Sequence, residues 1–565
     1  MTEINTLQKN CIGIDLGTTY SSISFYNKDK QRAQIVNKYD VSSSFPSQIH
    51  FSPTSNGNWI IELPSENLLN NQTRMFDSKR FIGKSYSQSL SDYFENGTFE
   101  LIHSENDDRP MMKLFNEEFS EQFYPEEISA CILHLLLQIL RERIEYNLSE
   151  DIFVVTVPVY FNSRQRQVTL SACKMIGMEN VTLLNEPTAS IIAYHKTNEI
   201  PVNKIVLVVD LGGGTMDVCL CKIVDNIIET KVNEIGSKQS SIEIIGYNGC
   251  PKLGGQNFTN VIAEMITQLL KEDYEEQFNK SMETENSKTR FKQMIQNEAE
   301  CVKRKFSYKS ISTVSIQVNK LFEKFEDIDS SYDIFISRDD FNEQCSSLIS
   351  QFKTTITDLL ESTGIKARDI DLLLPIGGSC FMPLIQETLL EMFPNTEQGD
   401  WKIDKRTAVC LGSCYRSFDI CQNNHYLLKD VLSQQLNIVI EEDKLIPFAN
   451  QYEQLPYISE RTFETHSRES FAVFQLYYGN GKTINDENVI RIISFSVTYP
   501  NDIIESNSNI RLKCIFKVDN EENITVIIYA NETKYLTTVT VDCHFHLMNL
   551  TEKSMMRIEK YINPN

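Results

Sequence analysis

The spacing of hydrophobic residues divides this chain into a helix-rich part and a strand-rich part. Before about residue 420, short hydrophobic runs alternate with segments of helical spacing. Residues 125–144 (PEEISACILHLLLQILRERI) are the clearest helix, because proline opens it, two acids occupy its first turn and arginine lies near its end. After that point the pattern changes to short alternating segments such as SFAVFQLYY and VIRIISFSVTY. These segments predict an antiparallel sheet or sandwich.

Other elements of the helix-rich part end in turns of small residues. Residues 185–194 (NEPTASIIAY) predict a turn that enters a helix, and residues 372–379 (LLLPIGGS) predict a strand that ends in glycines. Residues 258–308 are long, polar and helix-rich, and their charged stretches indicate a solvated helical face. Further strands are expected within 11–50, over 151–157 and from about residue 204, and further helices after Asn162 and over 383–392.

Two glycine-rich segments have nearly the same sequence. Residues 12–20 read IGIDLGTTY, and residues 208–218 read VVDLGGGTMDV. In each, an apolar run ends in an aspartate and then in a turn of glycine and threonine. Glycines let backbone N–H groups approach phosphate oxygens, threonine adds a hydroxyl donor, and the aspartate suits Mg²⁺ or its waters. One such loop is weak evidence, but two suggest related lobes that close on one nucleotide.

Length and charge narrow the class of protein. A chain of 565 residues is too long for one core, so several domains are expected. The composition is that of an ordinary globular protein, with 41% hydrophobic and 23% charged residues, which argues against wholesale disorder. The net charge of −23 argues against nucleic acid and anionic membranes as partners, because phosphate binding needs a basic surface. We interpret this charge mainly as a contribution to solubility.

The cysteines and the N-terminal segment indicate a reducing compartment. The chain has 14 cysteines, mostly in apolar surroundings, as for Cys131, Cys173, Cys301 and Cys410. Buried, reduced thiols are therefore expected rather than disulfides. The first residues lack the apolar core of a signal peptide, and no apolar run approaches the ~18 residues of a membrane span. We expect a cytoplasmic protein, with the nucleus as a second location and no membrane partner.

A series of ordered motifs then identifies a family. The motifs are IGIDLGTTYSS, FDSKRFIG, FYPEEISA, VVTVPVYFNSRQRQ, LLNEPTASIIAY, DLGGGTMDV, KLGGQNF and LLLPIGGS. With them the chain resembles the DnaK-type heat-shock 70-kDa chaperones and, more distantly, the actin and sugar-kinase ATPase superfamily. The match is good over about residues 11–418 and looser over 426–545. A lone G-x-G-x-x-G would be far less specific.

This resemblance implies an α/β fold in which a two-lobed, actin-like ATPase domain is followed by a mostly β sandwich domain. The implied divisions are an ATPase domain over 1–420, a linker over 421–431, a peptide-binding-like sandwich over 432–548 and a short tail over 549–565. The tail is expected to form at most a few helical turns over 551–562, which is too little for the family's helical lid. Without a lid, bound peptide would exchange quickly.

The resemblance assigns phosphate binding to the two glycine loops. The implied loop residues are Gly17, Thr18, Thr19 and Tyr20 in the first and Gly212, Gly213, Gly214 and Thr215 in the second. Asp15 and Asp210 match the acids that hold Mg²⁺ through water. Asp217 matches a group that assists with a monovalent cation, K⁺ being the candidate, or with the attacking water. Tyr20 is expected either to pack beside its loop or to use its hydroxyl group.

Hydrolysis of ATP to ADP is implied by four catalytic residues. Lys79, in FDSKR, matches the lysine that balances charge on the γ-phosphoryl group and orients water. Glu186, in NEPT, matches the acid that polarises this water, and Thr18 the hydroxyl that follows the γ-phosphate. Asp210 acts with them through the metal. A lone lysine or glutamate in a loop is usually only a solvated charge. Here each lies inside a longer matching motif, so we prefer the catalytic interpretation.

Adenosine binding and domain coupling are implied at further positions. Glu300, Lys303 and Ser307 are spaced i, i+3 and i+7, so they share one helix face. Such a face is ordinarily just charged surface, and only the motif order favours adenosine contacts. The other implied positions are Gly378 and Ser379 for adenosine, and Pro158 and Arg166 for a proline switch and an arginine relay to the sandwich. Pro158 also fits the simple end of a strand.

Several positions depart from the family pattern. After LGG the usual acidic stretch is replaced by neutral residues, among them Gln256, Asn257 and Thr259, so inter-lobe salt bridges are not expected there. Phe381 follows GGSC where the family has an arginine against adenine, and Arg406 lies where the family has an acid. These changes leave the phosphate chemistry intact but weaken the expected adenosine affinity. In the linker, Lys429 interrupts the leucines, so altered docking on the ATPase domain is expected.

Three functions are compatible with these residues. The first is an ATP-driven chaperone that binds unfolded or nascent polypeptides and works with a J-domain co-chaperone and a nucleotide exchange factor. The second is a lidless, weakly hydrolysing partner of other chaperones, like the ribosome-associated or exchange-factor branches of the family. The third is a small-molecule or sugar kinase, against which the β-rich C-terminal part and the FYPEEISA motif argue. Function must be decided by the site.

Overall fold

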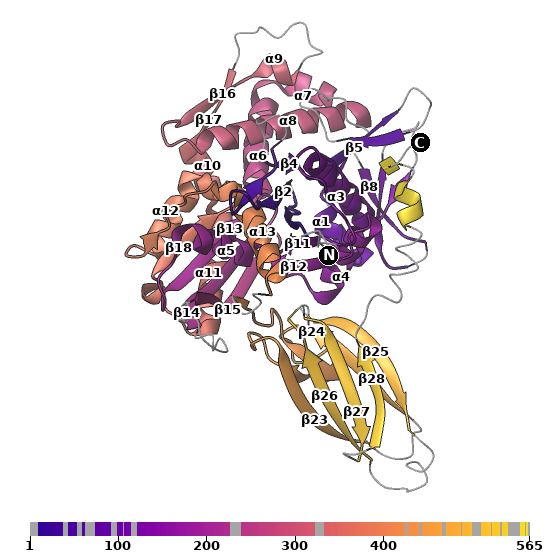
Figure 1. Ribbon diagram of the computed structural model, residues 1–565. Coiled ribbons are helices and arrows are strands. Elements are labelled where there is room, and N and C mark those ends of the chain that lie inside the picture. Colours follow the sequence, from indigo (N-terminus) through magenta and orange to yellow (C-terminus); the bar gives the residue numbers. More distant parts are fainter. Residues whose placement is uncertain are drawn as a thin grey trace, which may run out of the picture.

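The computed structural model describes most of the chain as two lobes that lie side by side with a β sandwich below them (Figure 1). Lobe I is built on the sheet that begins at residue 11, and lobe II on the sheet that begins at residue 205. The described residues are 9–37, 43–53, 59–62, 74–91, 99–105, 107–114, 121–226, 239–322, 333–423, 428–439, 443–465, 471–486, 489–499, 510–520, 522–531, 534–540, 554–559 and 561–562.

Lobe I combines a main sheet with two smaller sheets. The main sheet has the order β12 (Val181–Asn185), β11 (Ile152–Val157), β1 (Cys11–Asp15), β2 (Tyr20–Asn27) and β3 (Arg32–Ile35), with β4 (Phe45–Pro46) on β2. One smaller sheet has the order β6 (Trp59–Glu62), β5 (Gln48–Pro53) and β7 (Arg74–Phe76). The other has the order β10 (Gln122–Phe123), β9 (Pro110–Leu114) and β8 (Phe99–His103). The helices are α1 (Ser78–Phe81), α2 (Tyr86–Leu90), α3 (Pro125–Arg141) and α4 (Ser163–Met175).

Lobe II repeats the arrangement at the centre of the lobe I sheet. Its sheet has the order β19 (Glu397–Gln398), β18 (Leu372–Ile376), β13 (Ile205–Leu211), β14 (Met216–Asn226), β15 (Gln239–Cys250) and β20 (Leu428–Lys429). In both lobes the central strand forms an antiparallel hairpin with the next strand and pairs in parallel with a later one. Each hairpin turn carries one of the two glycine loops, so the predicted relationship between the lobes is visible in their topology.

Helices and a small hairpin complete lobe II. The helices are α6 (Gly255–Asp273), α7 (Glu275–Ser281), α8 (Glu285–Phe306), α9 (Val318–Leu321), α10 (Arg338–Gln344), α11 (Ser346–Thr363) and α12 (Pro383–Met392), with 3-10 turns η1 (Ala367–Asp369), η2 (Gly378–Phe381) and η3 (Lys405–Thr407). The hairpin is β16 (Thr313–Gln317) with β17 (Asp333–Ser337). The helices predicted over 258–308 and 383–392 are confirmed, and the helix predicted over 125–144 ends earlier, at Arg141.

The two lobes meet where helix α5 (Glu186–Asn198) crosses helix α13 (Ala408–Cys421). Helix α13 also packs on β1 and β11 of lobe I. Gly412 lies at the crossing, where a Cβ atom would be only 1.7 Å from the Ala189 carbonyl oxygen. The absence of a side chain at Gly412 therefore permits this close approach.

The linker lies on the edge of lobe II as strand β20. It pairs in parallel with β15, with Ile242 opposite Leu428 and Glu243 opposite Lys429. The Lys429 ammonium lies 3.7 Å from the Glu243 carboxylate, so the lysine has an acidic partner on the neighbouring strand. Lys429 therefore lies within a docked strand, and the expectation that it alters docking stays a prediction. Of the linker predicted over 421–431, Cys421 still belongs to α13, and residues 424–427 lie outside the described part.

The strand-rich part is the predicted sandwich of two antiparallel sheets. One sheet has the order β22 (Ile446–Ala449), β21 (Leu436–Val439), β24 (Phe471–Tyr478) and β25 (Ile490–Thr498), and the other β23 (Tyr457–Thr465), β26 (Ile510–Val518), β27 (Ile524–Ala530) and β28 (Lys534–Thr540). Along β27, buried and partly exposed residues alternate strictly, as expected for a strand with one face in the core. The core between the sheets includes Phe448, Phe474 and Phe516.

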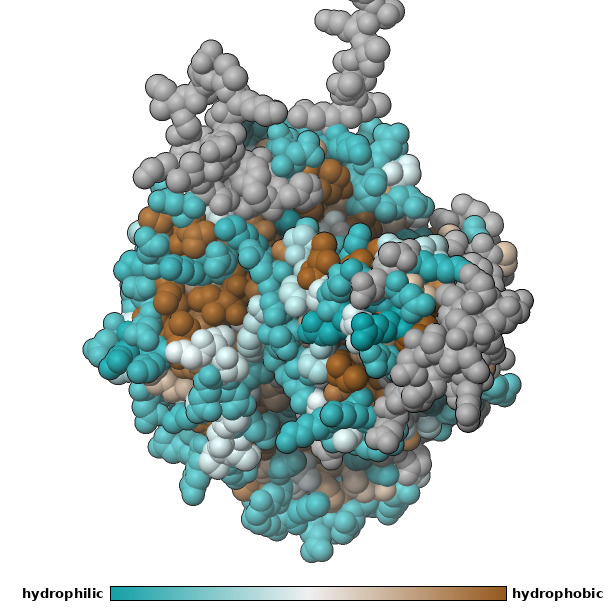
Figure 2. Space-filling view, turned by 90° about the horizontal axis from the view of Figure 1, so that it is seen from below, coloured by the Kyte–Doolittle hydropathy of each residue, from teal (hydrophilic) through white to brown (hydrophobic). Residues whose placement is uncertain are grey.

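Near the end of the chain, residues 554–559 and 561–562 are helical and lie against lobe I, away from the sandwich (Figure 1). The described part of the tail thus forms only a few turns, as predicted. Seen from below, the molecular surface is mostly hydrophilic and its hydrophobic residues form separate patches (Figure 2). No helix in the described part of the chain is long and apolar enough to cross a membrane.

The cysteines of the described residues are free thiols, and most of them are buried. Cys131, Cys173 and Cys410 lie in the core as predicted. Cys301 is the exception, because it points outward from α8 and is exposed. A buried position for Cys301 was therefore a wrong prediction, and the reason is that the apolar side of α8 lies elsewhere on the helix.

Candidate functional site

The two glycine loops, one from each lobe, lie directly against each other. A Cβ atom on Gly213 would lie 2.2 Å from the Thr19 hydroxyl oxygen, and one on Gly214 would lie 2.8 Å from a Thr18 methyl carbon. The loops are therefore in contact, and only glycine permits this spacing. Asp15 ends β1 and Asp210 lies near the end of β13, so both strands deliver their acid to the same place.

A buried lysine lies between these acids. The Lys79 ammonium donates a hydrogen bond of 2.5 Å to the Glu186 carboxylate and another of 2.5 Å to the Leu16 carbonyl oxygen. Lys79 comes from the short helix α1 and Glu186 from the first turn of α5. Both side chains are at least about nine-tenths buried in their ion pair. The structure thus brings together the two residues that sequence motifs placed 107 positions apart.

Four acids, of which Asp15 is partly buried and Glu186, Asp210 and Asp217 are buried, share the Lys79 ammonium group. Burial, and then the charge of Glu186, raises the pKa of Asp15 to about 7. The same two causes raise the pKa of Asp217 to about 8, and burial followed by Glu186, Asp217 and Asp15 raises the pKa of Asp210 well above its usual value. If all of these acids were ionised, the site would carry more negative charge than Lys79 balances, so the acids hold their protons tightly. Such a site favours a cation.

The residues present fit Mg²⁺ held mainly through water. Hard carboxylate oxygens are the ligands that Mg²⁺ prefers, and this ion usually keeps several waters. In the described part of the chain, no three acidic, histidine or cysteine side chains converge closely enough to hold a metal directly. Asp217 is also engaged elsewhere, because it accepts a hydrogen bond of 2.8 Å from the Val159 backbone N–H, next to Pro158.

These acids make stability depend on pH. The folded, nucleotide-free protein binds the protons of Asp15 and Asp217 more tightly than the unfolded chain does, since their pKa values are raised from 3.8. The free energy of unfolding should therefore fall as pH rises from about 4 to about 8. In Asp210→Asn this decline should be shallower, because one buried charge is removed. Urea unfolding of both proteins across this pH range measures it, and equal slopes would contradict the prediction.

Arg80 is a site residue that the sequence reasoning did not single out. It follows Lys79 on α1 and belongs to lobe I, yet its Nη2 atom lies 2.9 Å from the position of a Cβ atom on Gly214 in lobe II. Its Nε atom lies 3.5 Å from the Asp77 carboxylate. A guanidinium group thus lies beside the second glycine loop. The FDSKR motif contained it, but adjacency in sequence did not reveal which loop it reaches.

Two of the expected adenosine residues, Glu300 and Lys303, lie on helix α8 and contact helix α6. Lys303 lies 2.6 Å from the Glu300 carboxylate and donates hydrogen bonds to the Gly255 carbonyl oxygen and the Thr259 hydroxyl. Thr259 in turn donates to Glu300 at 2.8 Å. Burial, opposed by Glu300, lowers the pKa of Lys303. Thr259, which looked like a loss of charge in the sequence, is therefore part of this network.

The other positions expected to contact adenosine are not all joined to this network. The Ser379 hydroxyl donates to the Gly212 carbonyl oxygen at 2.9 Å, which links η2 to the second glycine loop. Gly378 faces open space, since a Cβ atom there would meet nothing within 4 Å. Ser307 caps α8, and its hydroxyl bonds to the Lys303 carbonyl oxygen within its own helix.

A contact between the lobes closes over this region. The Arg304 guanidinium of α8 donates a hydrogen bond of 2.6 Å to the Tyr20 hydroxyl group of lobe I and is paired with Glu300 at 3.0 Å. Tyr20 is 41% exposed, so its polar role, not packing, is the one seen here. Arg304 was not predicted, although it lies between Lys303 and Ser307 in the sequence.

Unlike the buried Thr259, three other residues that depart from the family pattern are at least partly exposed. Phe381 ends η2 and is 37% exposed, which leaves its ring available to a ligand. Arg406 is paired with Asp404 at 2.6 Å, so its charge is balanced from its own loop. Gln256 donates to Asn260 and Gln296, both in lobe II, which forms a neutral network on α6 and α8.

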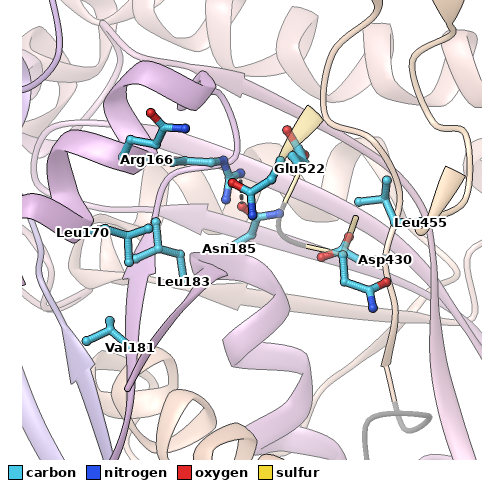
Figure 3. A pocket seen from close by; sticks show the side chains of 11 residues that line it. Arg166, Leu170, Val181, Leu183, Asn185, Asp430, Leu455 and Glu522 are labelled. Atoms are coloured by element: carbon cyan, nitrogen blue, oxygen red, sulfur yellow. Dashed lines mark hydrogen bonds between the residues drawn. The ribbon is translucent and has the colours of Figure 1, made fainter. Parts of the chain in front are cut away.

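Arg166 lies at the junction of lobe I with the linker and the sandwich. It donates to the Phe161 carbonyl oxygen at 3.0 Å and to the Asn185 side chain at 2.6 Å. Figure 3 shows it facing a small cavity of about 40 Å³ that Asp430 and Glu522 also line. Burial raises the pKa of Asp430, whereas the charge of Arg166 lowers it. The predicted arginine relay thus occupies a boundary between domains, and Pro158 directly follows the last residue of β11.

Comparison with known proteins agrees with this geometry. The family model described as Hsp70 protein matches residues 11–562. Heat shock cognate 70 kDa protein 3 of Dictyostelium discoideum is 26% identical over 548 residues, covering 94% of this chain and 80% of that protein. A ribosome-associated molecular chaperone of Eremothecium gossypii is 27% identical over 543 residues, covering 94% and 81%. Since the family match spans nearly the whole chain, the chain belongs to the Hsp70 family of ATP-dependent chaperones.

Proposed function

We propose that ATP binds with its phosphates between the two glycine loops and its adenosine against α6 and α8. The observation that carries this proposal is the cluster of four acids around Lys79 beside the facing loops. Asp15 and Asp210 would hold Mg²⁺ through water, and this ion supplies charge neutralisation on the phosphates. Asp217 is the candidate for a monovalent cation such as K⁺. Glu300, Lys303 and Ser379 line the adenosine side, with Phe381 as a stacking surface.

Hydrolysis would proceed by attack of water on the γ-phosphorus. The bond from phosphorus to the bridging oxygen breaks, ADP leaves with the bonding electrons, and the water loses a proton. Lys79 is held by Glu186 and Leu16, and its ammonium would balance charge that develops on the γ-phosphoryl oxygens. Glu186 polarises the water, Thr18 follows the γ-phosphate, and Arg80 adds a second positive group beside Gly214.

The docked linker suggests how nucleotide state reaches the sandwich. The Tyr247 hydroxyl of β15 donates to the Asp430 carboxylate at 2.7 Å and also bonds to Thr188 of α5. Helix α5 begins at Glu186, so one hydrogen-bonded chain connects the catalytic acid's helix to the linker. Undocking would release the sandwich and change its hold on a polypeptide. Unfolded or nascent chains, a J-domain co-chaperone and a nucleotide exchange factor are the proposed partners, in the cytoplasm.

Tyr247→Phe tests this coupling. Loss of the hydroxyl leaves the buried Asp430 carboxylate without its strongest partner, so we expect linker docking to weaken by about 1–3 kcal/mol. The factor by which ATP accelerates release of a fluorescent model peptide should then be at least about fivefold smaller than in the unaltered protein. Tyr477→Phe, on the sandwich away from the linker, is the matched control. Equal ATP acceleration in Tyr247→Phe and the unaltered protein would count against the proposed relay.

A weakly hydrolysing partner protein remains the second candidate. The neutral network of Gln256, Asn260 and Gln296, and Phe381 in place of an arginine, are the observations that favour it. Single-turnover hydrolysis with and without a J-domain protein and a peptide distinguishes the two. Strong stimulation supports the hydrolysing chaperone, whereas tight ATP binding without stimulated turnover supports the partner protein.

A further inference from the structure

The end of the chain is built into the core of lobe I. Ile558 is 1% exposed and Tyr561 is 4% exposed, and both belong to the hydrophobic core that α3 and the lobe I sheets form. The Tyr561 ring packs against Phe51 and Phe123, with ring centroids 5.4 Å and 5.6 Å away. Residues so deeply buried belong to a specific docking site.

Polar contacts fix the register of the docked segment. The Arg557 guanidinium lies 3.3 Å from the carboxylate of Glu127, which is itself fully buried, and it donates to the Gln122 carbonyl oxygen. Ser554 is 4% exposed, and its side chain hydrogen-bonds to Glu127. The guanidinium also lies over the ring of Tyr124, 5.7 Å from its centroid. Glu127 therefore receives two partners from the tail.

The segment is amphipathic, as a docked helix should be. Ser554, Ile558 and Tyr561 are buried at the spacing i, i+4, i+7, whereas Met556 is 73% exposed on the opposite face. A helix of this length does not persist alone in water, because nucleation costs more than so few hydrogen bonds return. Its helical form therefore depends on the surface of lobe I.

We propose that residues 554–562 are a strap that lobe I binds in cis. The linker ties the sandwich to lobe II through β20 and β15, and the strap ties the sandwich's last strand, β28, to lobe I. Residues 541–553 between β28 and the strap can span at most about 50 Å. When the linker leaves β15, the sandwich thus stays within that distance of lobe I. Because the linker ties the sandwich to lobe II and the strap ties it to lobe I, the position of the sandwich depends on how the two lobes sit relative to each other.

The strap does not depend on the proposed nucleotide chemistry, so the two can fail separately. Hydrogen exchange of the full-length chain tests it, with Ile558→Asp as the disruptive variant and Met556→Asp as the matched control on the exposed face. In the unaltered protein, amides of 554–562 should be protected. Ile558→Asp should accelerate their exchange about 30-fold or more and also raise exchange in lobe I residues 121–128, while Met556→Asp should change neither.

Glu127→Gln provides a milder variant that keeps the α3 capping box, since glutamine can replace glutamate there. It should accelerate exchange of the strap but leave the first turn of α3 protected. Exchange of 554–562 at the rate of an unstructured peptide in the unaltered protein would overturn the proposal, as would equal effects of Ile558→Asp and Met556→Asp. Protection that grows with protein concentration would show a strap exchanged between two copies and would overturn the cis assignment.

Discussion

Lys79→Ala is expected to lower single-turnover ATP hydrolysis by about 10²–10³-fold, the usual cost of removing one preorganised positive or hydrogen-bonding group from a transition state. The ammonium is buried and oriented by two hydrogen bonds, to Glu186 and Leu16, before any substrate arrives. Without it, the charge that develops on the γ-phosphoryl oxygens meets only the surrounding acids. Quench-flow measurement of ADP formation, with protein in excess over ATP, gives the rate of this step.

An exposed lysine far from the candidate site supplies the matched control. Lys366→Ala removes the same side chain beside η1 and should leave the rate within about twofold of that of the unaltered protein. Because Lys79→Ala also leaves Glu186 unpaired among other acids, its thermal unfolding should be compared with that of the unaltered chain in the same buffer. A folded Lys79→Ala protein that hydrolyses ATP within a factor of about three of the original would show that Lys79 is not the catalytic lysine.

Gly412→Ala should destabilise the ATPase part by about 3 kcal/mol or more. The added methyl group would lie 1.7 Å from the Ala189 carbonyl oxygen and 2.4 Å from its carbonyl carbon, and both are backbone atoms that cannot rotate away. Helices α5 and α13 would have to separate, which overpacks one side of the crossing and loosens the other. Since α5 begins at Glu186, the separation should also displace the partner of Lys79 and slow hydrolysis.

Gly378→Ala is the control for this substitution, because a Cβ atom there would meet nothing within 4 Å. Its stability should stay within about 0.5 kcal/mol of the original. Urea unfolding measures both variants, and single-turnover hydrolysis reports the position of Glu186. If Gly412→Ala unfolds at the same urea concentration as Gly378→Ala, then the close approach of α5 and α13 contributes little to stability.

Local pattern predicted much of the fold. The glycine loops after apolar runs, the helix that opens at Pro125 and the alternating strands of the sandwich all depend on neighbours a few residues apart, so each leaves a mark in the sequence. For the site, the sequence predicted only residues that lie inside recognisable motifs. Lys79, Glu186 and the acids around them are together in space, but their roles stay predictions until hydrolysis is measured.

What the sequence missed consists of contacts between distant segments. Arg304 sits beside a predicted residue, but only the approach of the lobes brings it to Tyr20, 284 positions away. Arg80 adjoins Lys79, but only folding shows that it reaches Gly214. Lys429 of the linker has its acidic partner, Glu243, on another strand. Charge and spacing within a motif carry no information about such partners.

The sequence by itself determined which strands end in glycine loops, which residues supply acids and a lysine beside them, and that a β-rich domain follows. These features are local, since backbone conformation and alternation of polar and apolar residues are set within a few positions. The tertiary structure alone decided that the loops touch, that the linker adds a strand to lobe II and that Ile558 and Tyr561 enter the core of lobe I. The physical reason is that burial and pairing energies arise between segments whose proximity depends on the whole fold.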